Sequence, residues 1–343
     1  MSGREKKRER QPTTQAPADK QGSTLGAWLV DKARAEGFDD AGVVRIEGPP
    51  KDAPALQAAV ASGRLLPFDW MARTLDQRMD VRVRMPSARS LLVVVQNYFT
   101  GDFEEHAATL DEGARARVAR ISRYAWGHDY HNVIRRRLRR LRTLLLEQAG
   151  GGRVAPFNDV DAVFERAWAH AAGLGFIGKS AMFIHPKLGT WTFLGGLITD
   201  LDLCGDVAPK PLQTDLCGTC TACLDACPTQ AITAPFVVDA RRCLVTWNVE
   251  EATDPRGDAL SAGSGWAVGC DVCQEVCPWN KFEQKTQEPR FQARHVFLDP
   301  HAPPTDIEGT ALARPGQDSL VHLAQRAGPA SMVRQRRQRP PSL

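Results

Sequence analysis

The spacing of apolar and polar residues in the first two hundred positions predicts a mixed α/β fold. Residues 25–37 carry apolar side chains at helical spacing and end on Gly37, which is typical of a short helix. Residues 41–46 form a short β run. Residues 90–99 (SLLVVVQNYF) form a continuous apolar, β-branched run, which indicates a strand buried on both faces. We therefore expect a sheet covered by helices.

A longer amphipathic helix is predicted from Asp129 to Glu147. Its apolar stripe recurs every three or four positions, at Val133, Ile134, Leu138, Leu141 and Leu145. Its other faces carry six arginines, at positions 135, 136, 137, 139, 140 and 142. Such a face is most often solvated, but it also suits the phosphates of a nucleic acid. Both interpretations stay open at the level of sequence.

The stretch GLGFIGKS, residues 173–180, matches two phosphate-binding motifs, G-x-G-x-x-G and G-x-x-x-x-G-K-S. Both motifs need a strand before the glycines and a helix after them, because the helix N-terminus holds the phosphate. Here residues 159–172 have helical spacing, and a hairpin is predicted next, with strands near 181–184 and 190–198. The predicted order is helix, loop, strand, so we do not expect phosphate binding.

The glycines of this stretch need another explanation. Gly173 is expected to end the preceding helix. Gly175 and Gly178 are expected to let the backbone pass close to a flat or bulky group.

The cysteines are concentrated near the end of the chain. There are nine, none before Cys204, and eight of them fall between residues 217 and 277. CGTCTACLDACP has the C-x2-C-x2-C-x3-C-P spacing of bacterial iron–sulfur proteins. CDVCQEVCP is a shorter variant, in which the distant Cys243 replaces the missing first cysteine. Zinc fits this spacing poorly, and a disulfide scaffold is not expected in a large intracellular chain.

The fourth cysteine of such a run binds the other cluster of the pair. We therefore expect one 4Fe–4S cluster on Cys217, Cys220, Cys223 and Cys277, and a second on Cys227, Cys243, Cys270 and Cys273. Cys204 is left over and is expected to be an ordinary packed thiol. Two adjacent clusters move electrons one at a time, so a group that receives electrons is expected among the first two hundred residues.

Composition adds bounds rather than a function. The 343 residues suit two or three small domains, and the formal net charge is only +4. Residues 1–23 and 334–339 are rich in arginine and lysine, and we expect disordered basic tails there. We find no apolar signal-peptide core and no apolar run of about 18 residues. We therefore expect a cytoplasmic protein without a membrane segment.

Several segments occur in a fixed order along the chain: RMDVR at 78–82, SARSLLVVVQNYF at 87–99, SRYAWGHDYHNVIRRRL at 122–138, GLGFIGKSAMFIHPKLGTWTFLGGLITD at 173–200, the two cysteine blocks, CPWNKF and GTALARPG. With these segments, residues 24–330 resemble the epoxyqueuosine reductases. The resemblance implies a nitroreductase-like, cobalamin-binding α/β catalytic domain over 24–205 and a ferredoxin-like domain with two 4Fe–4S clusters over 206–300. After residue 300 a short helical segment and the basic tail are expected.

The implied reaction is the reduction of epoxyqueuosine to queuosine at the wobble position of tRNA. Low-valent cobalamin would carry it out, fed by the two clusters and by an external donor such as a flavodoxin or a ferredoxin. The protein is expected to act as a monomer.

The resemblance also implies site residues. Asp159 is implied as the proton donor, with its pKa raised by burial, and Asp129 as a second carboxylate in the same pocket. An alternative role for Asp159 is to cap the helix that begins there. The implied contacts to the cofactor, besides Asp159, are Arg82, Ser122, Tyr130, His131, Gly175, Gly178 and Lys179.

Two other classes of protein remain open. One is a reductive dehalogenase-like enzyme that uses the same cofactors. The other is a plain iron–sulfur electron-transfer protein with an appended domain, which leaves the motifs before the cysteines unexplained.

Overall fold

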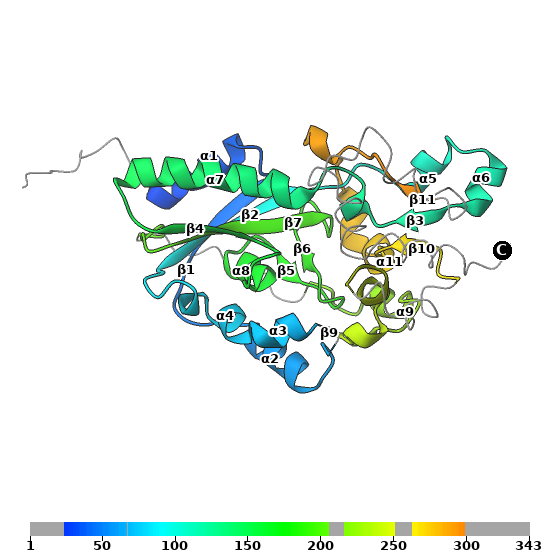
Figure 1. Cartoon of the computed structure of the whole chain (residues 1–343), viewed down its shortest axis with the longest axis horizontal. Helices are drawn as coiled ribbons and strands as arrows, with labels where there is room; N and C mark the ends of the chain where they lie inside the picture. Colours follow the sequence, from blue (N-terminus) through cyan, green and yellow to red (C-terminus); the bar gives the residue numbers. More distant parts are fainter. Residues whose placement is uncertain (1–23, 67, 206–215, 251–262, 299–343) are drawn as a thin grey trace, which may run out of the picture.

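The computed structural model describes residues 24–66, 68–205, 216–250 and 263–298 (Figure 1). The predicted basic tails at 1–23 and 334–339, the short helical segment expected after residue 300 and the GTALARPG motif lie outside these residues. Among the helices of the described ranges, none combines the length and the apolar character needed to cross a bilayer.

A four-stranded antiparallel sheet lies at the centre of the α/β part. Its order is β1 (Asp40–Arg45), β2 (Ser90–Asn97), β7 (Thr192–Thr199) and β4 (Val154–Asn158). All eight residues of β2 are buried, because the strand has neighbours on both edges and helices on both faces. The predictions of a strand near 41–46 and of a central buried strand at 90–99 are confirmed.

Helices α1 (Leu25–Ala35) and α7 (Tyr130–Ala149) cover one face of the sheet (Figure 1). The predicted stripe of α7 is buried against the sheet and α1, at Val133, Ile134, Leu138, Leu141 and Leu145. Gly37 and Gly150 follow the two helices with φ of 92° and 69°, which is the left-handed conformation that glycine adopts at low cost. Both predicted helices are confirmed.

The other face is covered by α8 (Glu165–Ala171), which packs Trp168 against the sheet. Beyond α8 lie the short elements α2 (Ala53–Ala61), α3 (Asp69–Arg73), α4 (Leu75–Met79) and η1 (Val81–Val83). The prediction of a helix from residue 159 is wrong for its first half. Residues 159–164 form a turn, because the Asp161 carboxylate accepts the backbone N–H of Asn158.

The segment after α8 follows the predicted order of helix, loop and strand. Gly173, with φ of 69°, closes α8 as its N–H donates to His170 O (2.9 Å) while that of Leu174 donates to Ala169 O (3.1 Å). Strand β5 (Phe176–Ile177) and strand β6 (Phe183–Ile184) then pair with each other. The helix that a phosphate-binding loop requires does not follow Ser180 in this described segment.

The predicted hairpin between strands near 181–184 and 190–198 is wrong in its pairing. Strand β6 pairs with β5, and β7 joins the central sheet between β2 and β4. A single bridge between His185 and Gly189 is the part of the expected hairpin that forms.

The cysteine-rich part lies beside the α/β part and shares a sheet with it. Strand β3 (Ala119–Ile121) lies between β10 (Trp266–Val268) and β11 (Phe297–Leu298). The remaining elements are α5 (Phe103–Ala107), α6 (Glu112–Arg117), η2 (Arg123–Ala125), α9 (Ala222–Asp225), β8 (Ile232–Ala234), β9 (Val237–Val238), η3 (Ala240–Arg242), η4 (Thr246–Glu250), α11 (Val272–Glu275), η5 (Pro278–Phe282) and η6 (Pro289–Phe291).

Candidate active site

The start of α7 holds a histidine in a fixed orientation. The carboxylate of Asp129 caps the helix, as its Oδ1 accepts the backbone N–H of His131 (2.9 Å) and its Oδ2 accepts the side-chain amide of Asn132 (3.0 Å). The same Oδ1 lies 2.7 Å from His131 Nδ1. The cap therefore fixes the imidazole ring relative to the helix.

The other nitrogen of His131 reaches the turn after β4. His131 Nε2 lies 2.8 Å from Asp159 Oδ1, and the Tyr130 hydroxyl donates to Asp159 Oδ2. The side chain of Asp159 is 48% exposed, whereas that of Asp129 is 5% exposed. The structure thus joins Asp129, His131 and Asp159 in one chain of hydrogen bonds that opens to the outside at Asp159.

The pKa of Asp159 in this hydrogen-bond chain differs from the expected one. Burial alone would raise the pKa of Asp159, but the hydrogen bond and charge of His131, together with the Tyr130 hydroxyl, lower it below its ordinary value. The predicted rise is therefore wrong. Burial alone would lower the pKa of His131, but its bonds to Asp129 and Asp159 outweigh burial and raise the pKa to about 9. At neutral pH the shared proton sits on His131.

Aromatic contacts hold Tyr130 in place. Its ring stacks on Phe193 of β7 with centroids 4.1 Å apart, and on His131 with centroids 4.0 Å apart. Burial, and then the charge of Asp159, raise the pKa of Tyr130 well above its ordinary value. Tyr130 is therefore a neutral hydrogen-bond donor to Asp159.

Glu165, the first residue of α8, is a functional candidate that the sequence pattern did not reveal. Its Oε1 is buried and has no hydrogen-bond partner among the described residues. Burial raises the pKa of Glu165 to about 8, and the negative charge of Asp159 adds to the rise while Arg78 opposes it. In the helix predicted from residue 159, nothing in the sequence pattern distinguishes Glu165 from an ordinary helical carboxylate.

Two predicted cofactor contacts are bound to carboxylates of the protein. Arg82 forms an ion pair with Asp80 (2.7 Å), and its side chain is 39% exposed. Ser122 is buried and donates to Asp271, which lies between Cys270 and Cys273 in the chain.

The eight predicted cluster ligands form two groups in space. Cys277 interacts electrostatically with Cys217, Cys220 and Cys223, and this set is the first cysteine group. Cys273 interacts in the same way with Cys227, Cys243 and Cys270, and this set is the second cysteine group. The grouping agrees with the one that the spacing predicts, and all eight are free thiols.

The environment of the thiols suits iron–sulfur clusters. Burial, and then neighbouring thiolates, raise the pKa of Cys270 to about 12, so its thiolate needs a positive partner that iron would supply. The described residues contain no set of three or more His, Cys, Asp or Glu side chains placed to bind one metal ion. A 4Fe–4S cluster needs a wider arrangement, because each thiolate binds a different iron. Cys204 is buried outside both groups, as expected.

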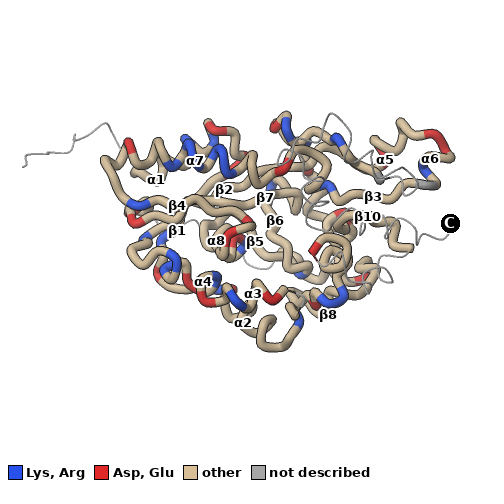
Figure 2. Tube along the Cα trace, in the orientation of Figure 1, with Lys and Arg blue, Asp and Glu red and all other residues tan. Residues whose placement is uncertain are grey.

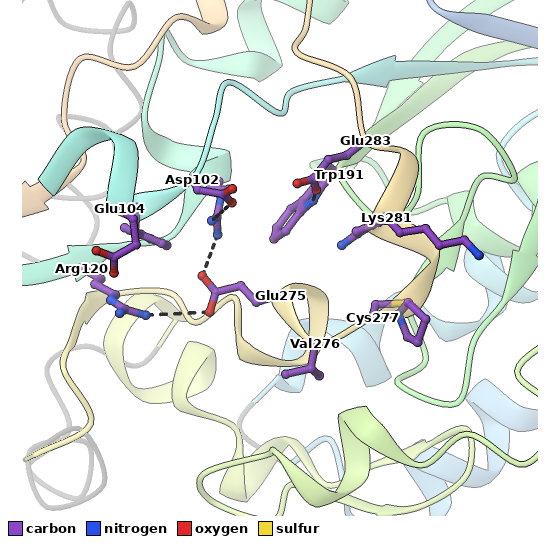
Figure 3. Close-up of a pocket in the computed structure, with 13 residues that line it drawn as sticks. Asp102, Glu104, Arg120, Trp191, Glu275, Val276, Cys277, Lys281 and Glu283 are labelled. Carbon is purple, nitrogen blue, oxygen red and sulfur yellow. Dashed lines mark hydrogen bonds and ion pairs between the residues drawn. The ribbon is translucent and has the colours of Figure 1, made fainter. Parts of the chain in front are cut away.

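An open pocket of about 650 Å³ reaches the first cysteine group at Cys277 (Figure 3). Its walls carry both signs of charge, and Arg120 and Arg123 pair with Glu275 at 3.9 and 2.9 Å. Trp191 forms part of its lining. Asp159 and Tyr130 are not among the residues that line it.

Two protein families match parts of the chain. Residues 216–280 match the family described as "4Fe-4S double cluster binding domain", and residues 78–160 match "Epoxyqueuosine reductase QueG, DUF1730". The second match includes the Asp129–His131–Asp159 chain. An α/β unit joined to a double-cluster domain in this way places the protein among the iron–sulfur oxidoreductases.

Relatives across most of the chain narrow this class. The epoxyqueuosine reductase of Synechococcus sp. (strain CC9605) is 38% identical over 82% of this chain and 84% of its own length. That of Xanthomonas campestris pv. campestris is 40% identical over 77% of this chain and 72% of its own. The chain belongs to the epoxyqueuosine reductase family. This membership favours the reductase over the dehalogenase-like and electron-transfer alternatives.

Solved structures of the family have the same fold. A crystal structure of epoxyqueuosine reductase with an epoxyqueuosine-modified tRNA stem loop has a TM-score of 0.74 and 23% identity, with 91% of this chain and 80% of that chain covered. The structure from Streptococcus thermophilus has a TM-score of 0.71 and 22% identity, with coverages of 90% and 79%.

Replacing Glu165 by glutamine should stabilise the protein as the pH rises. The pKa of Glu165 is raised from 4.5 to about 8 on folding, so ionisation costs more in the folded state. The cost is absent below about pH 4.5 and grows until about pH 8. We expect a gain on the order of 1–4 kcal/mol for Glu165→Gln at about pH 8 and almost none near pH 4.5, measured by denaturant unfolding. Glu147→Gln, on the exposed side of α7, should show no such trend; an equal gain at both pH values would contradict a buried carboxyl.

Proposed function

We propose that this protein reduces epoxyqueuosine to queuosine in tRNA. The observation that carries the proposal is that one polypeptide combines a carboxylate–histidine hydrogen-bond chain, exposed at Asp159, with two groups of four cysteines. Family membership over most of the chain supports it. The tRNA substrate is supported by the family member solved with an epoxyqueuosine-modified tRNA stem loop.

The two cysteine groups would each hold one 4Fe–4S cluster and pass electrons singly to the α/β part. The electrons would come from an external donor, such as a flavodoxin or a ferredoxin.

Cobalamin is the proposed cofactor, and it would supply a strongly reducing centre next to the substrate. Two exposed apolar side chains, Val83 and Val160, suit a large ring with apolar edges, since each is 57% exposed. Their loops are joined by the ion pair of Arg84 and Asp161 (3.0 Å). We propose Arg82, Tyr130, His131 and Asp159 as contacts on this side of the protein. The α/β part would thus provide the nitroreductase-like cofactor site that the resemblance implies.

The proton chemistry follows from the geometry of the site. Removing an epoxide oxygen as water consumes two electrons and two protons. Asp159 is the exposed end of the hydrogen-bond chain and would hand the first proton, supplied by His131 through its 2.8 Å contact, to the departing oxygen. The second proton would come from solvent through the same exposed carboxylate. Tyr130 and Asp129 would keep the two groups aligned. Because the pKa of His131 is about 9, the donor is loaded at neutral pH.

Anaerobically prepared protein should contain about eight irons per chain and convert epoxyqueuosine in tRNA to queuosine under reducing conditions. We expect Asp159→Asn to lower kcat/KM by about 100-fold or more while iron content stays unchanged. Nucleoside analysis of the treated tRNA measures the conversion. Unchanged turnover in this variant would rule out Asp159 as the donor, and zinc-loaded protein without iron would rule out the clusters.

The pH dependence of the activity should reveal the titration of His131. Activity of the native protein should be retained below about pH 9 and fall above it, because the chain then loses its proton. In His131→Gln the alkaline fall should disappear and kcat should drop at all pH values. An alkaline limb that persists in this variant would assign the titration to another group.

Blue positions along α7 in Figure 2 mark its arginines, and their contacts differ from one to the next. Arg137 is buried and pairs with Glu288, and Arg140 pairs with Glu36 at 2.5 Å. Arg136 and Arg139 are exposed. We propose these two as contacts to tRNA phosphates, because they lie on the helix that begins at Tyr130.

The double variant Arg136→Gln/Arg139→Gln should weaken tRNA binding and flatten its salt dependence by about 0.7 in log–log slope for each phosphate interaction that the variant removes. Binding measured at several salt concentrations gives this slope. The charge-matched variant Arg89→Gln/Arg115→Gln, at exposed positions elsewhere, should bind tRNA almost as the native protein does. Equal binding by both double variants would identify the α7 face as a solvated one.

A further inference from the structure

The glycine–lysine turn that resembles a phosphate-binding loop contacts the first cysteine group. The turn, residues 178–181, joins β5 to β6. The backbone N–H of Lys179 points at Cys217 Sγ across 3.4 Å. Lys179 Nζ donates to the carbonyl oxygens of Gly218 (2.5 Å) and Cys220 (3.0 Å). Lys179 therefore contacts three residues of the loop that carries Cys217 and Cys220.

The turn is built tightly enough to serve as a fixed support. The N–H of Gly178 donates to Met182 O (2.9 Å), and that of Ala181 donates to Gly178 O (2.8 Å). Ala181 has φ of 61°, a strained value for a residue with a side chain. A Cβ at Gly178 would lie 2.5 Å from Ile184 Cδ1 and 3.6 Å from Cys217 Sγ. Glycine at 178 therefore lets the backbone approach Ile184 of β6, whereas a Cβ would be at ordinary contact distance from Cys217 Sγ.

Further contacts attach the same hairpin to the cysteine-rich part. The carbonyl oxygen of Lys179 accepts the N–H of Phe236 at 2.9 Å. The ring of Phe176, on β5, packs edge-on against Trp279 with centroids 5.1 Å apart. Trp279 follows Cys277, the fourth member of the first cysteine group, by two positions. The hairpin thus touches this group through both of the chain segments that supply its thiols.

This geometry has an electrostatic consequence for a cluster at the first cysteine group. A 4Fe–4S cluster gains negative charge on reduction, so a nearby ammonium group and an N–H pointing at a ligand sulfur favour the reduced form. The second cysteine group has no such contact with Lys179 in the described structure. The influence of Lys179 should therefore act on one cluster of the two.

We propose that Lys179 is a positioning residue that holds the Cys217–Cys220 loop and raises the reduction potential of the cluster bound by the first cysteine group. This inference rests on the proposed clusters. It replaces the expected contact of Lys179 with the corrin by a contact with a cluster loop. The residues that imitate a phosphate site would therefore tune electron transfer between the cysteine-rich part and the α/β part.

The test compares Lys179→Met with Lys179→Arg in the full-length, cluster-loaded protein. Lys187→Met serves as the control, because Lys187 is exposed on the chain segment that follows β6. A redox titration followed by electron paramagnetic resonance gives the potential of each cluster. In Lys179→Met we expect the reduced-to-oxidised ratio of one cluster to fall about tenfold at a fixed potential, or about 59 mV for one electron. The other cluster should not change, Lys179→Arg should restore most of the ratio, and Lys187→Met should match the native protein.

Iron and cobalamin contents separate the possible failures. Loss of about four irons in Lys179→Met, with the other cluster retained, would support the holding role directly. Intact iron content with both cluster potentials unchanged would overturn the proposal. Reduced cobalamin content with unchanged cluster potentials would also overturn it, and would indicate that Lys179 contacts the corrin instead. Native protein that lacks two clusters would instead contradict the proposed function, so the two failures are distinct.

Discussion

A buried ion pair joins the two parts of the molecule, and the position of the second cysteine group relative to the segment before α7 depends on it. The side chains of Arg123 and Asp271 are 3% and 1% exposed and lie 3.2 Å apart. Asp271 also accepts the backbone N–H of Arg123 (2.8 Å) and the Ser122 hydroxyl, while Arg123 reaches Glu275 at 2.9 Å. Removing one member of such a pair leaves a buried charge without its partner, at a cost of about 3–5 kcal/mol. The Arg123–Asp271 pair fixes the loop that carries Cys270 and Cys273 against the segment before α7.

Residues 122–129 form a short segment that contacts both the second cysteine group and the Asp129–His131–Asp159 hydrogen-bond chain. Ser122 and Arg123 hold the loop between Cys270 and Cys273, and only a few residues later Asp129 caps α7 and orients His131. Because the backbone between them is packed around Trp126, which is fully buried, the separation of the cluster ligands from the proton chain is set by local structure. A redox reaction that moves electrons and protons together benefits from such a fixed separation.

The sequence predicts those helices and strands whose whole hydrophobic pattern lies within one continuous segment. Strand β2 is buried along its length and was identified from its continuous apolar run, while α7 was identified from the helical spacing of its apolar stripe. The pairing of β5 with β6 involves two residues on each side, too few to form a pattern. The lowered pKa of Asp159 depends on His131, which is distant in the chain, so burial alone gave the wrong direction. Glu165 escaped notice for the same reason, since its environment is set by neighbours in space.

The stretch that resembles a phosphate-binding loop shows why a motif needs its structural context. Backbone N–H groups and a lysine attract any compact negative group, whether phosphate oxygens or the thiolates around a cluster. In a phosphate site these donors stand at the start of a helix, whose dipole adds to their effect. Here they stand in a turn between two short strands, and the lysine is occupied by the carbonyl oxygens of Gly218 and Cys220. The same residue types therefore serve a cysteine loop, because the fold brings that loop to the turn.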